Sequence, residues 1–214
     1  MITTRSTYGY IGGSDANRLF GSFETDTFRA WWQERLTGIS LTSFSTIDTA
    51  VGNIMEAKVL DEVGVLPEHR NIFVKKEGSM AGINTDALCP EFYHEVKTSL
   101  PEGVYDWLRG MAVSASYRRQ IMHGLYVTGR KAAKIHVLPL TRAEKKNVFG
   151  IDIKGRVKTF VFGSDGLITG EGFNVEFKNP KPFDFDDYDR RVRYLDMCFA
   201  KKERPSDSGF NQFT

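Results

Sequence analysis

The chain has 214 residues, of which 41% are hydrophobic and 26% charged; this composition is typical of a globular domain and excludes a disordered or fibrous protein. Its two cysteines, Cys89 and Cys198, are too few for a disulfide framework or a four-thiolate iron–sulfur cluster. It shows neither a signal peptide nor an apolar run of membrane-spanning length, which predicts a soluble intracellular protein.

The net charge of +2 hides an uneven distribution along the chain. Residues 118–158 contain eleven Lys and Arg against only Glu144 and Asp152, whereas residues 1–63 contain five basic and eight acidic residues. A strongly basic stretch favours a partner with a phosphate backbone. An ordinary solvated face is the alternative explanation.

A loop near the N-terminus, residues 11–15 with the sequence Ile-Gly-Gly-Ser-Asp, is predicted to enter a helix that begins near Asp15. Ser14 or Asp15 would be the N-cap. Free backbone N–H groups and the helix dipole at Gly13 and Ser14 could receive a phosphate. A plain cap explains the same residues.

Two more helices are predicted, over residues 28–36 and residues 47–63. In the second, Gly52 and Glu56 share a face because they are four residues apart. A glycine inside a helix costs stability, so we expect a backbone or ligand to approach Gly52 closely. The apolar positions at helical spacing in this segment are Ile47, Val51, Ile54, Met55, Val59 and Val63.

Residues 82–99 are predicted to form a hairpin that turns at residues 89–91, after a strand over residues 70–76. Alternate residues of a strand share a face, so Glu95 and Lys97 point the same way while Val96 points into the core. Asp86 on the partner strand can face the same spot. Two carboxylates and an ammonium suit a hard cation such as Mg²⁺, which activates a water molecule for attack on a phosphate.

Short acid-x-lysine patterns of this kind also occur elsewhere, at residues 56–58, 152–154 and 176–178. The last of these even has Asp165 upstream of Glu176 and Lys178. A solvated strand face carries such pairs without any function, so the pattern alone does not choose the site.

The second half of the chain contributes a helix over residues 116–128, a strand over 134–140, a hairpin over 148–153 and 157–162, and a helix over 185–201. A flexible tail is predicted from residue 205 to 214. The apolar stripes of the two helices are Tyr117, Ile121, Met122, Leu125 and Tyr126 for the first, and Tyr188, Val192, Leu195 and Phe199 for the second.

The order of these motifs resembles the PD-(D/E)XK nuclease superfamily, and more narrowly its phage lambda exonuclease and viral recombinase branch, which is related to RecB-type nucleases. The ordered set is specific although each motif is weak, and it favours Glu95 over Glu176. The matching motifs are Ile11 to Asp15, Gly52-x-x-x-Glu56, Asn84-Thr85-Asp86, Glu95-Val96-Lys97-Thr98, and Gln120 to Gly129.

The resemblance implies an α/β (α+β) fold with a central mixed β-sheet flanked by helices, a restriction-endonuclease-like core. The resemblance covers roughly residues 8–140. We expect one nuclease domain over residues 1–204, in which a C-terminal hairpin and helix at 141–204, matching no motif of the family, follow this core. The arginine that contacts a 5′-phosphate in such exonucleases is not in register in this sequence; Arg5 and Arg18 are the nearest candidates. A phage-encoded member would act in the host cytoplasm.

The resemblance also implies roles for individual residues. Asp86, Glu95 and the Val96 carbonyl would bind Mg²⁺ or Mn²⁺, with Glu56 acting directly or through water. Lys97 would serve the attacking water, and Gln120 would orient Lys97 or the metal shell. Gly13 and Ser14 would bind phosphate. Contacts to DNA would come from Arg118, Arg119, Arg130, Lys131 and Lys134.

The implied activity is metal-dependent 5′ to 3′ exonuclease action on duplex DNA in recombination or replication, beside a single-strand annealing protein. Some relatives form trimeric rings, so a homo-oligomer is expected. Two alternatives remain: a structure-selective or nicking endonuclease on the same fold, and a non-catalytic DNA-binding module. The complete set of Asp86, Glu95 and Lys97 argues against the module.

Overall fold

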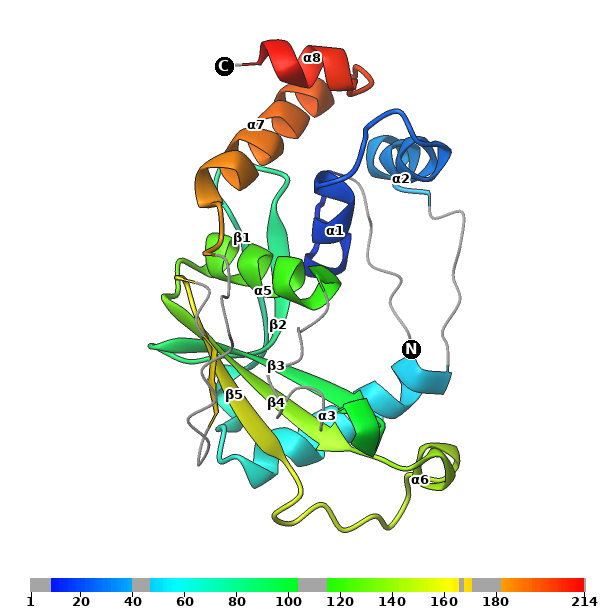
Figure 1. Ribbon diagram of the computed structural model, residues 1–214, viewed down its shortest axis with the longest axis vertical. Coiled ribbons are helices and arrows are strands. Elements are labelled where there is room, and N and C mark those ends of the chain that lie inside the picture. The colour runs from blue at the N-terminus through cyan, green and yellow to red at the C-terminus, as the bar shows by residue number, and fades with distance from the viewer. Residues whose placement is uncertain (1–8, 40–46, 104–114, 166–167, 171–181, 214) are drawn as a thin grey trace.

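The computed structural model describes residues 9–39, 47–103, 115–165, 168–170 and 182–213. Along the described chain, helices come before the first strand, between some of the strands and after the last strand (Figure 1). The helices and strands are η1 (Gly13–Asp15), α1 (Ala16–Leu19), α2 (Asp26–Thr37), α3 (Ile47–Glu62), η2 (Pro67–His69), β1 (Arg70–Lys75), β2 (Gly82–Leu88), β3 (Phe92–Ser99), α5 (Ala115–Thr128), β4 (Ala132–Pro139), α6 (Arg142–Lys146), β5 (Lys158–Gly163), β6 (Ile168–Gly170), α7 (Phe185–Lys201) and α8 (Asp207–Gln212).

A mixed sheet of six strands, in the order β1-β2-β3-β4-β5-β6, forms the centre of the described structure. Among the six strands of this described sheet, only β3 and β4 run parallel to each other, and they stay paired from Phe92 opposite Ala132 to Ser99 opposite Pro139. A parallel pair needs a crossover connection, and α5 lies within it. The prediction of a mixed sheet flanked by helices is confirmed.

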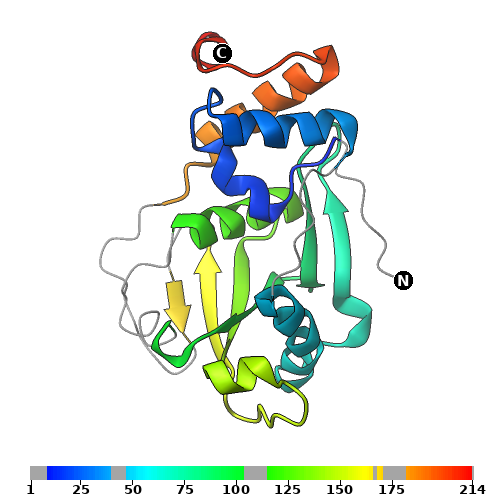
Figure 2. The ribbon, with the colours of Figure 1, turned by 90° about the vertical axis from the view of Figure 1, so that its right-hand side faces the viewer.

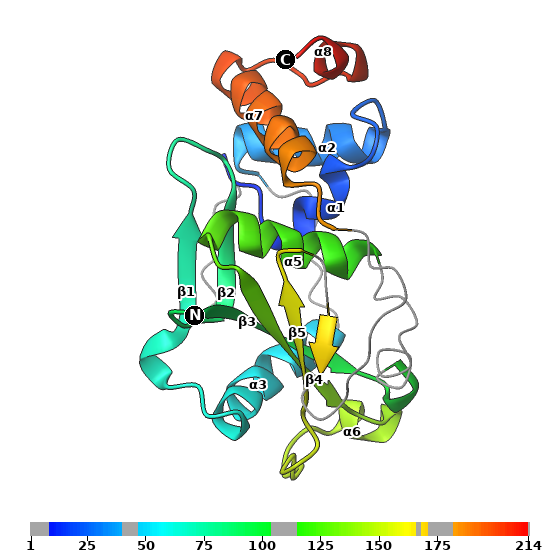
Figure 3. The ribbon, with the colours of Figure 1, turned by 60° about the vertical axis from the view of Figure 1, so that its left-hand side comes forward.

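The two faces of the sheet carry different helices. On one face, the Tyr93 hydroxyl of β3 donates to the Ile121 carbonyl of α5. Strand side chains alternate between faces, so Val96 points the other way, where it packs on the cluster that contains Val51 and Met55 of α3. The helices α1, α2 and α7 lie beyond α5, on its side away from the sheet (Figure 3).

The helix and strand bounds agree with the sequence except in the second half of the chain. Residues 148–153 are not a strand: Val148 and Ile153 are buried, but β5 pairs with β4 and β6 instead. Two residues of the predicted buried stripes face outwards, namely Ile54 and Tyr117. They lie at the margins of stripes whose other described members pack inwards.

The predicted flexible tail is instead helix α8. The Ser206 hydroxyl accepts the Gly209 N–H as its N-cap, and Phe210 is buried. The Asp207 carboxylate accepts hydrogen bonds from the Ser22 hydroxyl (2.5 Å) and the Phe23 N–H (2.8 Å). The prediction of a loose segment is therefore wrong for residues 206–213, which pack onto the N-terminal helices.

A buried histidine links α5 to β2 and α7. His123 Nε2 lies 2.7 Å from the Gly82 carbonyl oxygen and must donate to it, so Nδ1 accepts from the Tyr188 hydroxyl at 2.6 Å. Burial lowers the pKa of His123, against the opposing effects of the Gly82 carbonyl and Asp15. The neutral imidazole is thus the form that the fold requires.

We expect this histidine to make the fold sensitive to acid. In the unfolded chain His123 takes up a proton near its ordinary pKa of about 6.5, while the folded state resists protonation. Its contribution to the free energy of unfolding is therefore complete above about pH 6.5 and is lost as the pH falls towards the lower folded pKa. Chemical unfolding at several pH values should show that the free energy of unfolding falls less between pH 7.5 and 5 for His123→Gln than for the wild type. Parallel plots of this free energy against pH would contradict the expectation.

Candidate active site

The strands β2 and β3 diverge at the predicted site. They pair only at Ala87 with His94 and at Leu88 with Tyr93, although β2 continues beside β1 as far as Gly82. Beyond the last pair, the Asp86 carboxylate accepts the Val96 N–H through Oδ2 at 2.6 Å. A side chain thus takes the place of a ladder hydrogen bond, and it places Asp86 beside the outgoing part of β3.

Glu95 is the centre of the polar contacts at this fork and is only 6% exposed. Its Oε1 accepts from Lys97 Nζ at 2.5 Å and from Gln120 Nε2 at 2.7 Å. Gln120 comes from α5, so this helix and β3 together enclose the carboxylate. The structure therefore brings Asp86, Glu95, Lys97 and Gln120 together, with Gln120 bonded to Glu95 and not to Lys97.

Negative charge dominates the electrostatics of the site. Burial, together with the Glu95 and Glu56 carboxylates, raises the pKa of Asp86 to about 8. Burial and Glu95 also raise the pKa of Glu56, which places this α3 residue within electrostatic reach of the fork. Burial alone would lower the pKa of Lys97, but Glu95 and Asp86 overcome it, so the pKa is raised and the ammonium stays charged.

This donor set fits a divalent cation in chemical type. The buried Glu95 is bonded to Lys97, and the half-buried Asp86 and Glu56 interact electrostatically with both; a hard cation with oxygen ligands would offset the excess negative charge. The hydrogen bonds at the fork use one oxygen of Asp86 (Oδ2) and one of Glu95 (Oε1), and Oδ1 and Oε2 would serve a metal ion. Among the side chains that the structure describes, no three His, Cys, Asp or Glu converge as a ready ligand group.

Tyr117 belongs to the site although its sequence position suggested a core stripe. It lies beside Glu95, Lys97 and Gln120, and its ring centroid lies 5.6 Å from Lys97 Nζ. The signal that could have indicated this is its spacing: Tyr117 is three residues before Gln120 and so shares its helix face.

The glycine loop lies next to this site. A Cβ atom on Gly13 would stand 3.3 Å from Cγ of Gln120. Ser14 is exposed and lines a cleft of about 370 Å³ together with Arg18 and Ser116. Asp15 stands at the N-cap position of α1, as predicted, but its side chain makes no capping hydrogen bond to that helix. Its Oδ2 instead accepts the N–H of Gly12, the N-cap of η1, at 3.0 Å.

Asp15 instead forms a buried ionic network that the sequence did not reveal. Arg35 Nη2 lies 3.0 Å from Asp15 Oδ2, and Trp31 Nε1 donates to Asp15 Oδ1 at 2.9 Å. Arg35 is also buried, and its Nε and Nη1 have no hydrogen-bond partner in the described structure. The network fixes the glycine loop to α2.

The five predicted DNA contacts do not form one patch. Arg119 lies on α5 directly before Gln120, over the Phe20 ring and bonded to Asn17. Its neighbour Arg118 lies over the Phe183 ring. The other three are in or near the turn into β4, where Arg130 donates to the Cys89 carbonyl, Lys131 is exposed, and Lys134 lies over the Phe92 ring. Lys134 alternates with Ile135, so it faces away from α5.

Two other predictions are changed by the structure. A Cβ atom on Gly52 would meet nothing within 4 Å, so the close approach expected there is not found. The Asp152 carboxylate accepts the Lys154 N–H at 3.0 Å and forms a turn, not a strand face. Glu176 and Lys178, the competing acid-x-lysine pair, lie outside the described residues.

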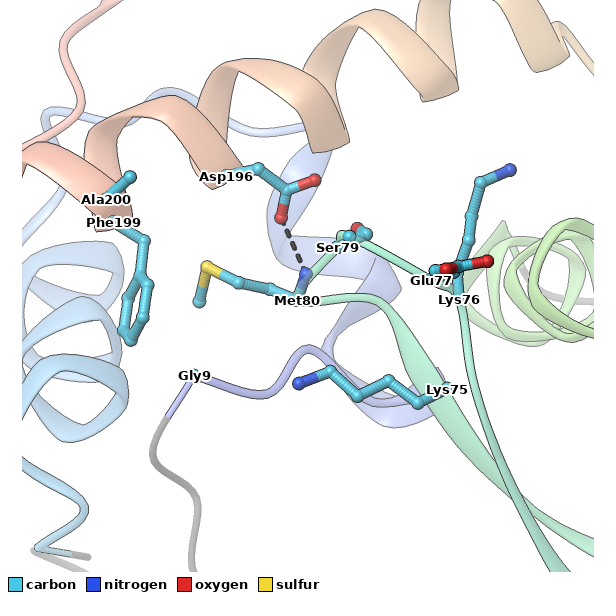
Figure 4. A pocket seen from close by; sticks show the side chains of 10 residues that line it. Gly9, Lys75, Lys76, Glu77, Ser79, Met80, Asp196, Phe199 and Ala200 are labelled. Atoms are coloured by element: carbon cyan, nitrogen blue, oxygen red, sulfur yellow. Dashed lines mark hydrogen bonds between the residues drawn. The ribbon is translucent and has the colours of Figure 1, made fainter.

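A larger cleft of about 700 Å³ lies between the β1–β2 turn and α7 (Figure 4). Its carboxylate Asp196 accepts the Met80 N–H at 2.7 Å. This contact joins α7 to the strand pair that carries Asp86. The hydrogen bond therefore helps to fix α7 to the β1–β2 turn.

Comparisons with known proteins concern the fold. No protein-family model matches the chain, and no curated protein matches it. Across the described residues, no helix is both long and apolar enough to cross a membrane.

Solved structures do match over most of the chain. An alkaline exonuclease, LHK-Exo, from Laribacter hongkongensis has a TM-score of 0.60 at 10% identity, covering 92% of this chain and 90% of its own. The structure of the same enzyme in complex with dAMP has a TM-score of 0.56 at 11% sequence identity, covering 92% of this chain and 88% of its own. A phage-related exonuclease from Haemophilus somnus 129PT has a TM-score of 0.58 at 16% sequence identity, covering 91% of this chain and 96% of its own. The chain therefore has the fold of these exonuclease structures.

Proposed function

We propose that this chain is a metal-dependent DNA exonuclease that hydrolyses phosphodiester bonds of duplex DNA, from the 5′ end, in recombination or replication. The observation that carries the proposal is the fork at which Asp86, Glu95, Lys97 and Gln120 meet. The similarity to two exonuclease folds supports it. One similar structure was solved with dAMP, a mononucleotide of the kind that an exonuclease releases.

The metal ligands would be Asp86, Glu95 and the Val96 carbonyl, with Glu56 acting directly or through water. A bound Mg²⁺ or Mn²⁺ would supply charge compensation for the phosphate and a more acidic water. Asp86, with its raised pKa, must lose its proton to serve as a ligand, which favours activity at neutral to alkaline pH.

The lysine and the glutamine would position the reacting groups. Lys97 remains an ammonium because its pKa is raised; it therefore orients the attacking water or offsets charge on the phosphate and does not act as a base. Gln120 holds the Glu95 carboxylate in place. Ser14 and Gly13 would bind the terminal phosphate, with Arg18 at the same cleft.

The activity is tested with linear and covalently closed duplex DNA, with 5′-phosphate or 5′-hydroxyl ends, in Mg²⁺, Ca²⁺ or chelator. We expect mononucleotide release from linear DNA in Mg²⁺, a preference for 5′-phosphate, and no cleavage in chelator. Ca²⁺ should fail because it takes looser and larger coordination, which misplaces the water. Cleavage of closed circles would instead establish an endonuclease, and full cleavage in chelator would exclude the metal mechanism.

A further inference from the structure

The segment between β4 and β5, residues 141–158, displays a large aromatic ring to solvent. Phe149 is 78% exposed, more than any other large hydrophobic residue in the described part of the chain. A single exposed apolar residue is ordinary on a protein surface. Phe149 differs from such a residue in three ways: its loop is held rigidly, the loop is basic, and the loop starts beside the candidate active site.

The loop holds Phe149 outward by fixed anchors on both sides. Val148 and Ile153 are 4% and 7% exposed and pack into one apolar cluster. The Arg156 guanidinium binds the Glu144 carboxylate at 2.8 Å and 3.1 Å and the Pro139 carbonyl at 2.8 Å. A ring presented from such a braced loop loses little conformational freedom when it binds a ligand.

The surroundings of the ring are basic. Residues 141–158 contain six Lys and Arg against two acidic residues. One of the acids, Glu144, is bonded to Arg156, while Arg142, Lys146 and Lys154 are exposed. An exposed aromatic ring among cations is the combination that binds single-stranded nucleic acid, by stacking on bases and by attraction to phosphates.

The segment begins at the edge of the candidate active site. The Leu140 N–H donates to the Ser99 carbonyl at 2.8 Å, two residues beyond Lys97. Its buried anchors share their cluster with Met55, the neighbour of Glu56 on α3. In Figure 2, α6 lies beside α3.

We propose that residues 141–158 bind a DNA strand beside the active site, with Phe149 stacked on an unpaired nucleobase and Arg142, Lys146 and Lys154 at the phosphates. This inference rests on the proposed function for its substrate class. It adds DNA-contacting residues that follow Lys134, the last of the five predicted from the sequence. The charge favours DNA as the occupant, because a second copy docked through the same face would bring like charges together.

The test measures binding of a short single-stranded DNA that contains 2-aminopurine, in chelator so that it is not cut. Stacking on an aromatic ring contributes about 1 kcal/mol or more per base, which corresponds to about a 5-fold change in Kd. We expect Phe149→Ala to weaken binding at least about 5-fold and to reduce the quenching of 2-aminopurine. Phe149→Tyr should retain both, and so should Phe73→Ala, a control for an exposed phenylalanine (52%) on the edge strand β1.

The outcomes separate this inference from the proposed function. The inference would be overturned if the Phe149→Ala variant bound the DNA with the Kd of the wild type, or if the wild type did not bind the DNA. So would a Phe149→Ala defect that coincides with a change of oligomeric state in sedimentation, because the ring would then cover another copy. If stacking is observed but linear duplex is not hydrolysed in Mg²⁺, the strand-binding surface stands and the exonuclease proposal fails.

Discussion

Replacing Lys97 with alanine is expected to lower kcat by about 100- to 1,000-fold, the loss that follows removal of one charge-stabilising donor from a reaction centre. Its ammonium lies 2.5 Å from Glu95 Oε1 and keeps its charge. Because the lysine would act on the attacking water or on developing charge, the loss should be in kcat and not in DNA affinity. Single-turnover rates and direct binding measurements distinguish the two.

A matched control is Lys75→Ala, which removes an exposed lysine from the edge strand β1 and should leave kcat unchanged. For the carboxylate, Glu95→Gln should inactivate, whereas Glu91→Gln in the exposed turn of the same hairpin should not. An active Lys97→Ala enzyme, or an inactive Glu91→Gln enzyme of normal stability, would show that the reaction centre lies elsewhere.

Replacing Asp15 with alanine is expected to lower the free energy of unfolding by about 3–5 kcal/mol, since it leaves a buried guanidinium without its partner. Arg35 is 6% exposed and Asp15 is 8% exposed. Two nitrogens of Arg35 already lack partners within the described structure, so the Asp15 carboxylate is its main compensation. Chemical denaturation gives the value directly.

The control for this effect is Asp26→Ala, because the Asp26 side chain is 99% exposed and its pair with Arg29 should contribute little. A double variant, Asp15→Ala with Arg35→Leu, should recover part of the lost stability, since the unpaired charge is removed. If the double variant is no more stable than Asp15→Ala alone, the buried charge is not the cause.

The sequence predicts a helix or strand well where one of its faces is buried and where charged or capping residues stand at both of its ends. Helix α7 was predicted over its observed bounds, because Tyr188, Val192 and Leu195 recur at helical spacing and acids precede them. Residues 148–153 are rich in the apolar and β-branched residues of strands but lie in a loop, since burial of Val148 and Ile153 does not require ladder hydrogen bonds. Pairing partners depend on the whole sheet and cannot be derived from a local pattern.

For the candidate site, the strand period of two places Glu95 and Lys97 on one face, and the structure has them in contact. The bond from Val96 N–H to Asp86 depends on the divergence of β2 from β3, which no local spacing expresses. Likewise, the partners of Asp15 lie on another helix, 16 and 20 residues away. Contacts between elements are decided by packing, and a single sequence does not contain them explicitly.

The packing of the C-terminal residues onto the first helices has a consequence for folding during synthesis. Asp207 bonds to Ser22 across 185 residues, and Arg191 bonds to the Leu19 carbonyl across 172. Such distant contacts are slow to form because a long chain must close first. The N-terminal helices, with the glycine loop between them and the sheet, can complete their packing only after residues 191–207 have left the ribosome. Until then they remain exposed to chaperones and proteases.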